Sequence, residues 1–101
     1  MIKVLIADDH PIVRQGLKQI LEEQPDMKVT TEARNGQQAI DLAGGADCDV
    51  VLLDLDMPGK SGLDVLKVLK GSRPKLPVLI LSIHPEEQFA LRVLKAGAYG
   101  Y

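Results

Sequence analysis

The 101 residues are 46% hydrophobic and 26% charged and carry a net charge of −2, which is the balance of one ordinary globular domain. The scattered basic residues exclude a strongly basic nucleic-acid-binding surface, and no apolar run approaches the roughly 20 residues that cross a bilayer. The single cysteine, Cys48, cannot form an internal disulfide, which favours a reducing compartment and a buried, unreactive thiol. We therefore expect one cytoplasmic domain, residues 1–101, with no membrane contact and no DNA contact of its own.

Short apolar runs separated by amphipathic segments predict alternating strands and helices. The predicted strands cover residues 2–7, 28–33, 48–54 and 76–82. Strands that alternate with helices imply right-handed crossovers and a parallel sheet with helices on both faces. We therefore expect a doubly wound α/β fold.

Capping and stop residues delimit the predicted helices. Pro11 suits the first turn of a helix capped by Asp9 or His10, and Pro25 stops it. Its predicted apolar face consists of Ile12, Val13, Leu17, Ile20 and Leu21. Three further helices are expected over residues 35–45, 61–71 and 85–97. In the third helix we expect the inward residues to be Leu63, Val65, Leu66 and Leu69.

Three aspartates follow two of the predicted strands. Asp8 and Asp9 end the first apolar run and Asp54 ends the third, so neighbouring parallel strands would bring their carboxylates to one edge of the sheet. One aspartate after a strand is usually a turn residue. Three converging aspartates need a compensating positive charge, because each close pair of like charges repels by roughly 4 kcal/mol at about 4 Å and an effective dielectric of about 20. We therefore expect a bound divalent cation, with Mg²⁺ first and Mn²⁺ as its substitute, since the ligands are oxygens.

Other charged residues near this edge receive simpler interpretations. His10 adjoins the acidic pair, but one imidazole beside oxygen ligands is better interpreted as a helix-start residue lining the cleft than as a metal ligand. We interpret Arg14, Lys18 and Arg34 as ordinary solvated charges.

Several motifs occur in a fixed order along the chain. They are the acidic pair, Asp54 within Leu-Leu-Asp-Leu-Asp-Met-Pro-Gly, Ser82 after the following apolar run, and Tyr101 after Ala-Gly-Ala at residues 96–98. This ordered set spans the chain and resembles the receiver domain of two-component response regulators. Residues 7–17 and 95–101 are especially similar to the subfamily that carries a LuxR/NarL-type helix-turn-helix output domain.

The resemblance implies a flavodoxin-like (βα)5 fold with strand order 2-1-3-4-5. The family places a lysine three residues beyond the position of Tyr101, where this sequence ends. We therefore expect the last βα unit to be incomplete in this chain and the output domain to be absent from it.

The resemblance also implies roles for particular residues. Asp54 is expected to accept a phosphoryl group from a sensor histidine kinase. Asp8, Asp9, Asp54 and the backbone carbonyl of Asp56 are expected to hold Mg²⁺. The Ser82 hydroxyl would contact a phosphoryl oxygen, and Tyr101 would be the aromatic residue that turns inward on activation. Such a domain is a signalling module rather than an enzyme, and it reaches DNA only through its output domain.

Two alternatives remain open from the sequence. The Asp54-Leu-Asp56 sequence also resembles the nucleophile motif of haloacid-dehalogenase-type phosphohydrolases, in which Asp56 would be a general acid. That motif is expected on the first strand, whereas here an acidic pair precedes it. The other alternative is a receiver-like interaction module that acts as a homodimer, because an uncovered apolar edge strand favours pairing.

Overall fold

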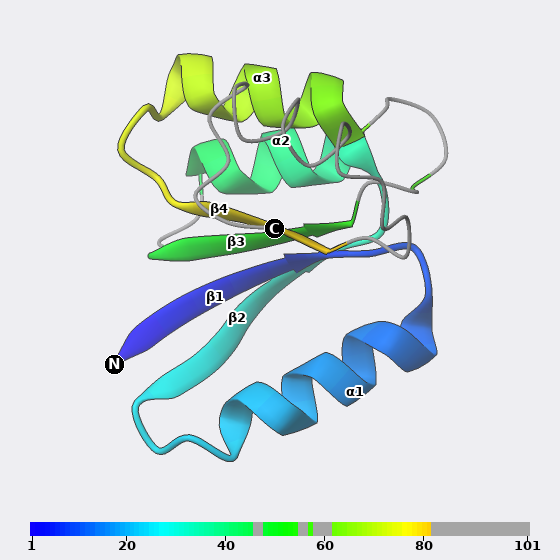
Figure 1. The fold of residues 1–101 in the computed structure, drawn as a ribbon, viewed down its shortest axis with the longest axis vertical. Helices are drawn as coiled ribbons and strands as arrows, with labels where there is room; N and C mark the ends of the chain where they lie inside the picture. The colour runs from blue at the N-terminus through cyan, green and yellow to red at the C-terminus, as the bar shows by residue number, and fades with distance from the viewer. Residues whose placement is uncertain (46–47, 55–56, 58–61, 82–101) are drawn as a thin grey trace, which may run out of the picture.

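The computed structural model describes residues 1–101 except 46–47, 55–56, 58–61 and 82–101. Strands and helices alternate along the described part (Figure 1). Their order is β1 (Ile2–Ala7), α1 (Pro11–Glu22), β2 (Met27–Ala33), α2 (Gly36–Gly45), β3 (Val50–Asp54), α3 (Gly62–Ser72) and β4 (Val78–Leu81). The predicted fourth helix and the predicted cap at Ser61 lie outside the described residues.

The four strands form one parallel sheet in the order β2-β1-β3-β4. Ala7 at the end of β1 lies opposite Ala33 of β2 and Leu53 of β3, so these three strands end at the same edge. The predicted doubly wound class and the first four positions of the predicted strand order are therefore confirmed. The fifth position of the predicted strand order lies outside the described residues.

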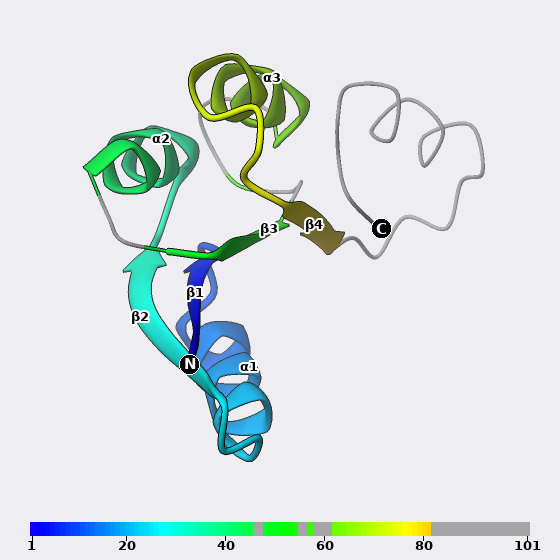
Figure 2. The ribbon, with the colours of Figure 1, turned by 90° about the vertical axis from the view of Figure 1, so that its left-hand side faces the viewer.

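Helices cover both faces of the sheet, with α1 on one face and α2 and α3 on the other (Figures 1 and 2). Alternate residues of β1 supply the two resulting cores, because successive side chains of a strand point to opposite faces. Val4 and Ile6 join the smaller core, and Leu5 and Ala7 join the larger one. The part of a central strand that is buried on both faces must be apolar, which explains the unbroken apolar run over residues 4–7 of β1.

The apolar face predicted for α1 is wider than the strip that packs on the sheet. Leu17 and Leu21 pack against the smaller core. Ile12 and Ile20 are 85% and 62% exposed, and Val13 is also exposed. Leu17 and Leu21 are one turn apart and share the side of the helix that meets the sheet. Of the five residues of the predicted apolar face, three are therefore exposed and two pack on the sheet.

The other helices agree more closely with the sequence. Asn35 caps α2, because its Oδ1 accepts the backbone N–H of Gln38 at 2.9 Å. In α3, Val65, Leu66 and Leu69 are buried and Leu63 packs against the larger core, as predicted. Among the described helices, none has both the length and the apolar character needed to span a membrane.

Candidate metal centre

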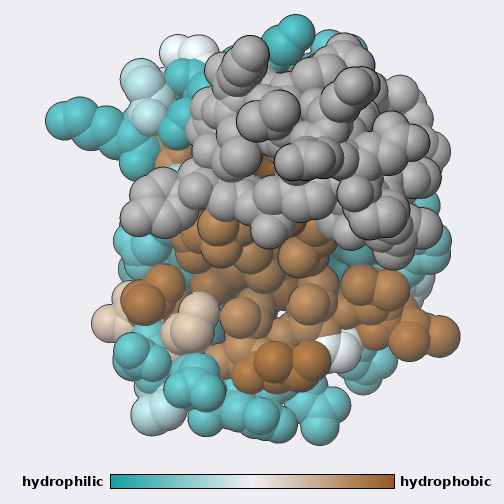
Figure 3. All heavy atoms as spheres, in the orientation of Figure 1, coloured by the Kyte–Doolittle hydropathy of each residue, from teal (hydrophilic) through white to brown (hydrophobic). Residues whose placement is uncertain are grey.

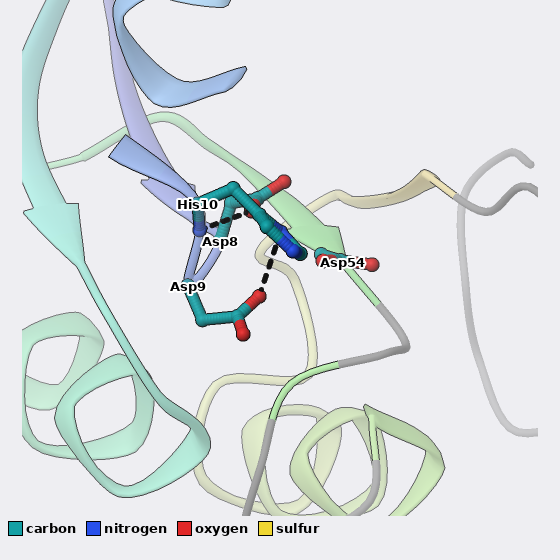
Figure 4. Close-up of side chains that lie close together, drawn as sticks. All are labelled: Asp8, Asp9, His10 and Asp54. Carbon is teal, nitrogen blue, oxygen red and sulfur yellow. Dashed lines mark hydrogen bonds and ion pairs between the residues drawn. The ribbon is translucent and has the colours of Figure 1, made fainter. Parts of the chain in front are cut away.

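Three carboxylates from neighbouring strands meet at one edge of the sheet (Figure 4). Asp8 and Asp9 follow β1, and Asp54 is the last residue of β3, which pairs in parallel with β1. One oxygen of each carboxylate and one ring nitrogen of His10 all lie within 4.8 Å of one another. The structure thus brings together the three aspartates that the sequence predicts to converge, and adds an imidazole to them.

Asp8 and Asp54 are held in largely buried positions, with 4% and 8% of their surface exposed. The backbone N–H of Asp8 donates to the carbonyl of Ala33 at 3.0 Å, so β2 also helps to place this loop. Oδ1 of Asp8 accepts the backbone N–H of His10 at 2.8 Å. Burial of a carboxylate is costly without such partners, and the loop geometry supplies them locally.

Asp9 leaves one oxygen poorly satisfied. Its side chain is 25% exposed. Its Oδ1 atom is nevertheless shielded from solvent, and its nearest partner among the described residues is Nδ1 of His10, 2.9 Å away. A shielded carboxylate oxygen beside two further carboxylates suits a cation as ligand, and oxygen donors suit Mg²⁺. The described residues therefore fit a hard divalent ion.

His10 lies at the start of α1, as predicted, in an extended conformation that precedes the helix. Its Nδ1 atom is 3.0 Å from Oδ1 of Asp8 and 2.9 Å from Oδ1 of Asp9 (Figure 4). The hydrogen bond with Asp8, followed by the negative charge of Asp9, raises the pKa of His10 above 6.5. The imidazole thus offsets part of the negative charge of the cluster.

Arg14 is not the solvated charge that the sequence predicts. Its side chain is 12% exposed, and its Nε lies 3.4 Å from Oε1 of Glu32 on β2. Its Nη1 donates to the backbone carbonyl of Asp8 at 2.8 Å. Arg14 therefore joins α1 and β2 to the loop that carries the acidic pair. Arg34, in contrast, is exposed as predicted.

The position of Arg14 in the helix explains how it reaches the loop. Arg14 lies four residues after His10, and its backbone N–H donates to the His10 carbonyl at 3.0 Å. Side chains on a helix lean toward the N-terminus, so a long side chain one turn inside can extend back over the residues before the helix. This i,i+4 spacing was the available signal in the sequence.

Three predicted site residues lie outside the described part of the chain. They are Asp56, Ser82 and Tyr101. The backbone ligand, the phosphoryl-contacting hydroxyl and the switch aromatic therefore stay predictions.

The response regulator receiver domain family matches residues 4–101. This chain belongs to that family. The curated relatives of the receiver domain include the nitrate/nitrite response regulators NarP and NarL of Escherichia coli K12. NarP is 43% identical over 98% of this chain and 46% of its own length, and NarL is 42% identical over 97% and 45%. The receiver domain thus spans less than half the length of these relatives.

Solved structures confirm the receiver fold. The response regulator domain of Thermotoga maritima CheB has a TM-score of 0.93 at 33% identity, over 99% of this chain and 75% of that one. The receiver domain of a putative NarL from Mycobacterium tuberculosis has a TM-score of 0.91 at 33% identity, over 98% and 80%. The resemblance to two-component response regulators is therefore confirmed, and family membership contradicts the phosphohydrolase alternative.

Proposed function

We propose that Asp54 accepts a phosphoryl group from a sensor histidine kinase with the help of Mg²⁺, for which Mn²⁺ can substitute. The convergence of Asp8, Asp9 and Asp54 within 4.8 Å carries this proposal. In the longer cytoplasmic protein, phosphorylation would change the activity of a C-terminal helix-turn-helix domain that binds DNA. The receiver domain itself, residues 1–101, is a signalling module in this scheme and turns over no substrate of its own.

The transfer needs a nucleophile and a means of offsetting charge. An oxygen of Asp54 forms a bond to phosphorus as the bond from phosphorus to the phosphohistidine nitrogen breaks. The leaving nitrogen keeps the electron pair, and the product is an aspartyl phosphate. Bound Mg²⁺ would offset the electrostatic repulsion between the negatively charged Asp54 carboxylate and the phosphoryl oxygens.

The remaining site residues position the reacting groups. Asp8, Asp9 and Asp54 would hold the ion together with the backbone carbonyl of Asp56. The Ser82 hydroxyl would donate to a phosphoryl oxygen, and Tyr101 would turn inward as that hydroxyl moves. Positioning of this kind would supply most of the rate enhancement, because phosphoryl transfer requires little covalent chemistry from the protein.

Two related structures support this chemistry. A response regulator from Burkholderia pseudomallei, 27% identical over 100% of this chain and 58% of that one, with a TM-score of 0.88, contains a phosphorylated aspartic acid and a calcium ion. RcsB from Salmonella enterica serovar Typhimurium was solved bound to promoter DNA in the presence of the phosphomimetic BeF3−. It is 30% identical over 99% of this chain and 84% of that one, with a TM-score of 0.91. We propose that this receiver domain likewise carries a phosphorylated aspartate and a divalent ion, and that it acts on DNA through an output domain.

The test is incubation with acetyl phosphate and Mg²⁺, followed by intact-mass spectrometry. We expect the wild-type chain to gain the mass of one phosphoryl group, about 80 Da, and Asp54→Asn to gain none. Asp41→Asn is the matched control, because Asp41 is an exposed aspartate on α2, and it should be labelled like the wild type. A gain that survives Asp54→Asn would refute the assignment of Asp54.

Self-association is a second candidate function, and the exposed apolar residues of α1 favour it. Ile12 and Ile20 are 85% and 62% exposed, and the apolar surface of the described part is broad in Figure 3. Large exposed apolar areas often mark interfaces. Light scattering across a range of concentrations tests this proposal. We expect a dimer that Ile12→Lys disrupts, and a monomer at every concentration would refute it.

A further inference from the structure

One extra residue in β2 decides which side chains at the end of that strand face α1. The residues of β1 pair first with Val29 and then with Thr31, so Thr30 is an extra residue and forms a β-bulge. Side chains of a strand alternate between its faces, and a shift of one residue reverses every side chain beyond it. Val29 therefore packs in the smaller core under α1, whereas Ala33, an even number of residues later, packs in the larger core on the opposite face.

The bulge brings Glu32 to the face of the sheet that α1 covers. Glu32 lies opposite Ile6, whose side chain is in the smaller core under α1. Without the extra residue, Glu32 would lie opposite Ala7 and face away from α1. In the structure, Oε1 of Glu32 lies 3.4 Å from Nε of Arg14, which donates through Nη1 to the Asp8 carbonyl at 2.8 Å. Bulges next to functional sites commonly re-aim a side chain in this way.

β2 thereby holds Asp8 on both sides of its Cα atom. The backbone N–H of Asp8 donates to the carbonyl of Ala33 at 3.0 Å. The carbonyl of Asp8 accepts from Arg14, which is paired with Glu32, the residue before Ala33. The Asp8 carbonyl belongs to the peptide group that joins Asp8 to Asp9, so its orientation sets the direction in which the chain enters Asp9. The contacts form a closed ring from β2 through the acidic loop to α1 and back to β2.

The environment of Arg14 makes its partner on β2 important. An ion pair with a carboxylate as exposed as that of Glu32, at 39%, ordinarily contributes little. The Arg14 side chain is only 12% exposed, however. Its Nε atom is shielded from solvent, and the carboxylate that faces it is that of Glu32. Loss of this counter-charge would favour movement of the guanidinium toward solvent and away from the Asp8 carbonyl.

We propose that Glu32 is a positioning residue for the metal centre, which acts by holding Arg14 against the carbonyl of Asp8. This inference rests on the proposed function, because it concerns the same Mg²⁺ site. Positioning and simple electrostatics predict opposite effects at Arg14. Removal of a nearby positive charge should strengthen the binding of a cation, since like charges repel. Loss of the contact that orients the acidic loop should weaken that binding.

The experiment is calorimetric titration of Mg²⁺ into the wild-type chain, Glu32→Gln, Arg14→Ala and the double variant. We expect Arg14→Ala to weaken Mg²⁺ binding by about tenfold and Glu32→Gln by about threefold. Because Glu32 acts through Arg14, Glu32→Gln should change the affinity by less than about 1.5-fold when residue 14 is already alanine. Glu23→Gln is the matched control, because Glu23 is an exposed glutamate at the end of α1, and it should bind Mg²⁺ like the wild type.

Arg14→Lys is a second variant that keeps the positive charge. Lysine carries a single ammonium group and lacks the planar fork that reaches two partners at once. We therefore expect Arg14→Lys to bind Mg²⁺ more weakly than the wild type, and it replaces Arg14→Ala in the comparison if that variant does not fold.

Amide hydrogen exchange without metal gives a second measurement, which does not depend on the proposed function. The backbone N–H groups of Asp8 and His10 are hydrogen-bonded within the ring and the loop, so both should exchange faster in Glu32→Gln than in the wild type. Unchanged exchange would overturn the proposal even if the wild type bound no Mg²⁺, a result that would refute the proposed metal site.

Three results of the titration would overturn the role of Glu32 while leaving the metal site intact. The first is equal Mg²⁺ affinity in Glu32→Gln and the wild type. The second is tighter Mg²⁺ binding in Arg14→Ala, which would mean that the charge of Arg14 matters more than its position. The third is the same loss on Glu32→Gln with and without Arg14, which would show that Glu32 acts on the ion directly.

Discussion

At the scale of single residues, Arg14 links three parts of the receiver domain. Its guanidinium donates to the Asp8 carbonyl at 2.8 Å and lies 3.4 Å from the carboxylate of Glu32. A hydrogen bond from a charged group stabilises a fold by about 1.5–3 kcal/mol, more than a neutral one does. The loop that carries Asp8 and Asp9 therefore depends on a side chain from the following helix.

Replacing Arg14 should affect both stability and the metal centre. We expect Arg14→Ala to lower the free energy of unfolding by about 1–3 kcal/mol, because the Asp8 carbonyl loses its partner. Urea denaturation measures this, and a Mg²⁺ titration should show weaker binding. Arg34→Ala is the control, since Arg34 is exposed and its loss should change stability by less than about 0.5 kcal/mol. Equal effects of the two substitutions would contradict the linking role.

His10 should titrate above its ordinary range. The hydrogen bond with Asp8 and the negative charge of Asp9 favour the imidazolium, so the pKa in the folded chain is raised above 6.5. The stability gained from this shift is fully present below pH 6.5 and is lost as pH rises through the folded pKa. Saturating Mg²⁺ should lower that pKa, because the ion competes for the same carboxylates.

NMR titration of the imidazole resonances with and without Mg²⁺ measures both effects. A pKa at or below 6.5 in the metal-free chain would show that the contacts to Asp8 and Asp9 do not form in solution.

The three aspartates could be predicted from the sequence because each follows an apolar run, and parallel strands end at one edge. The contacts of His10 and Arg14 could not be predicted as readily. Both depend on how a side chain is oriented at the start of α1, and strand periodicity contains no such information. The predicted roles of Asp56, Ser82 and Tyr101 rest on the family resemblance, and these residues lie outside the described part of the chain.

At the scale of elements, the sheet and its helices hold the site through buried apolar contacts. Short apolar runs predicted all four strands to within two residues, because β1, β3 and β4 are short and mostly apolar, as buried parallel strands are. In β2 the buried residues Val29 and Ala33 are separated by polar ones. The helical pattern was less informative for α1. The pattern identifies apolar residues at helical spacing. How many of them the sheet covers depends on the tertiary structure, which the pattern does not contain. Ile12 and Ile20 are exposed for this reason.

A matched pair of substitutions in α3 tests the packing of the larger core. Val65 is 0% exposed and Val68 is 42% exposed on the same helix. Val65→Ala should cost about 2 kcal/mol of unfolding free energy through lost burial and a residual cavity. Val68→Ala should cost about 0.5 kcal/mol or less. Denaturant midpoints measure the difference, and similar losses at both positions would mean that α3 packs on the sheet in another orientation.

At the scale of the whole molecule, the fold creates the metal centre by strand order. β1 lies beside β3 although α1, β2 and α2 separate them in sequence. That topology places Asp8 and Asp9 next to Asp54, which follows Asp9 by 45 positions in the chain. The doubly wound topology therefore makes one site from two loops, and the order of strands could be predicted only through the family resemblance.

The receiver domain covers less than half of the length of its curated relatives. It spans 46% of NarP and 45% of NarL, so activities of those relatives that require their remaining length are proposals for this protein. DNA binding and kinase recognition belong to this group. The metal centre can be tested on the chain alone, because the described residues contain its three carboxylates.

The most direct test of the account is the stabilisation of the chain by Mg²⁺, measured by urea unfolding of the wild type and of Asp54→Asn. A ligand that binds only the folded state adds about 2.7 kcal/mol when its free concentration is about a hundredfold above its dissociation constant. We predict a gain of this size in the wild type and a much smaller gain in Asp54→Asn, while the exposed control Asp41→Asn should match the wild type. An equal gain in Asp54→Asn, or none in the wild type, would contradict a single ion site built from Asp8, Asp9 and Asp54.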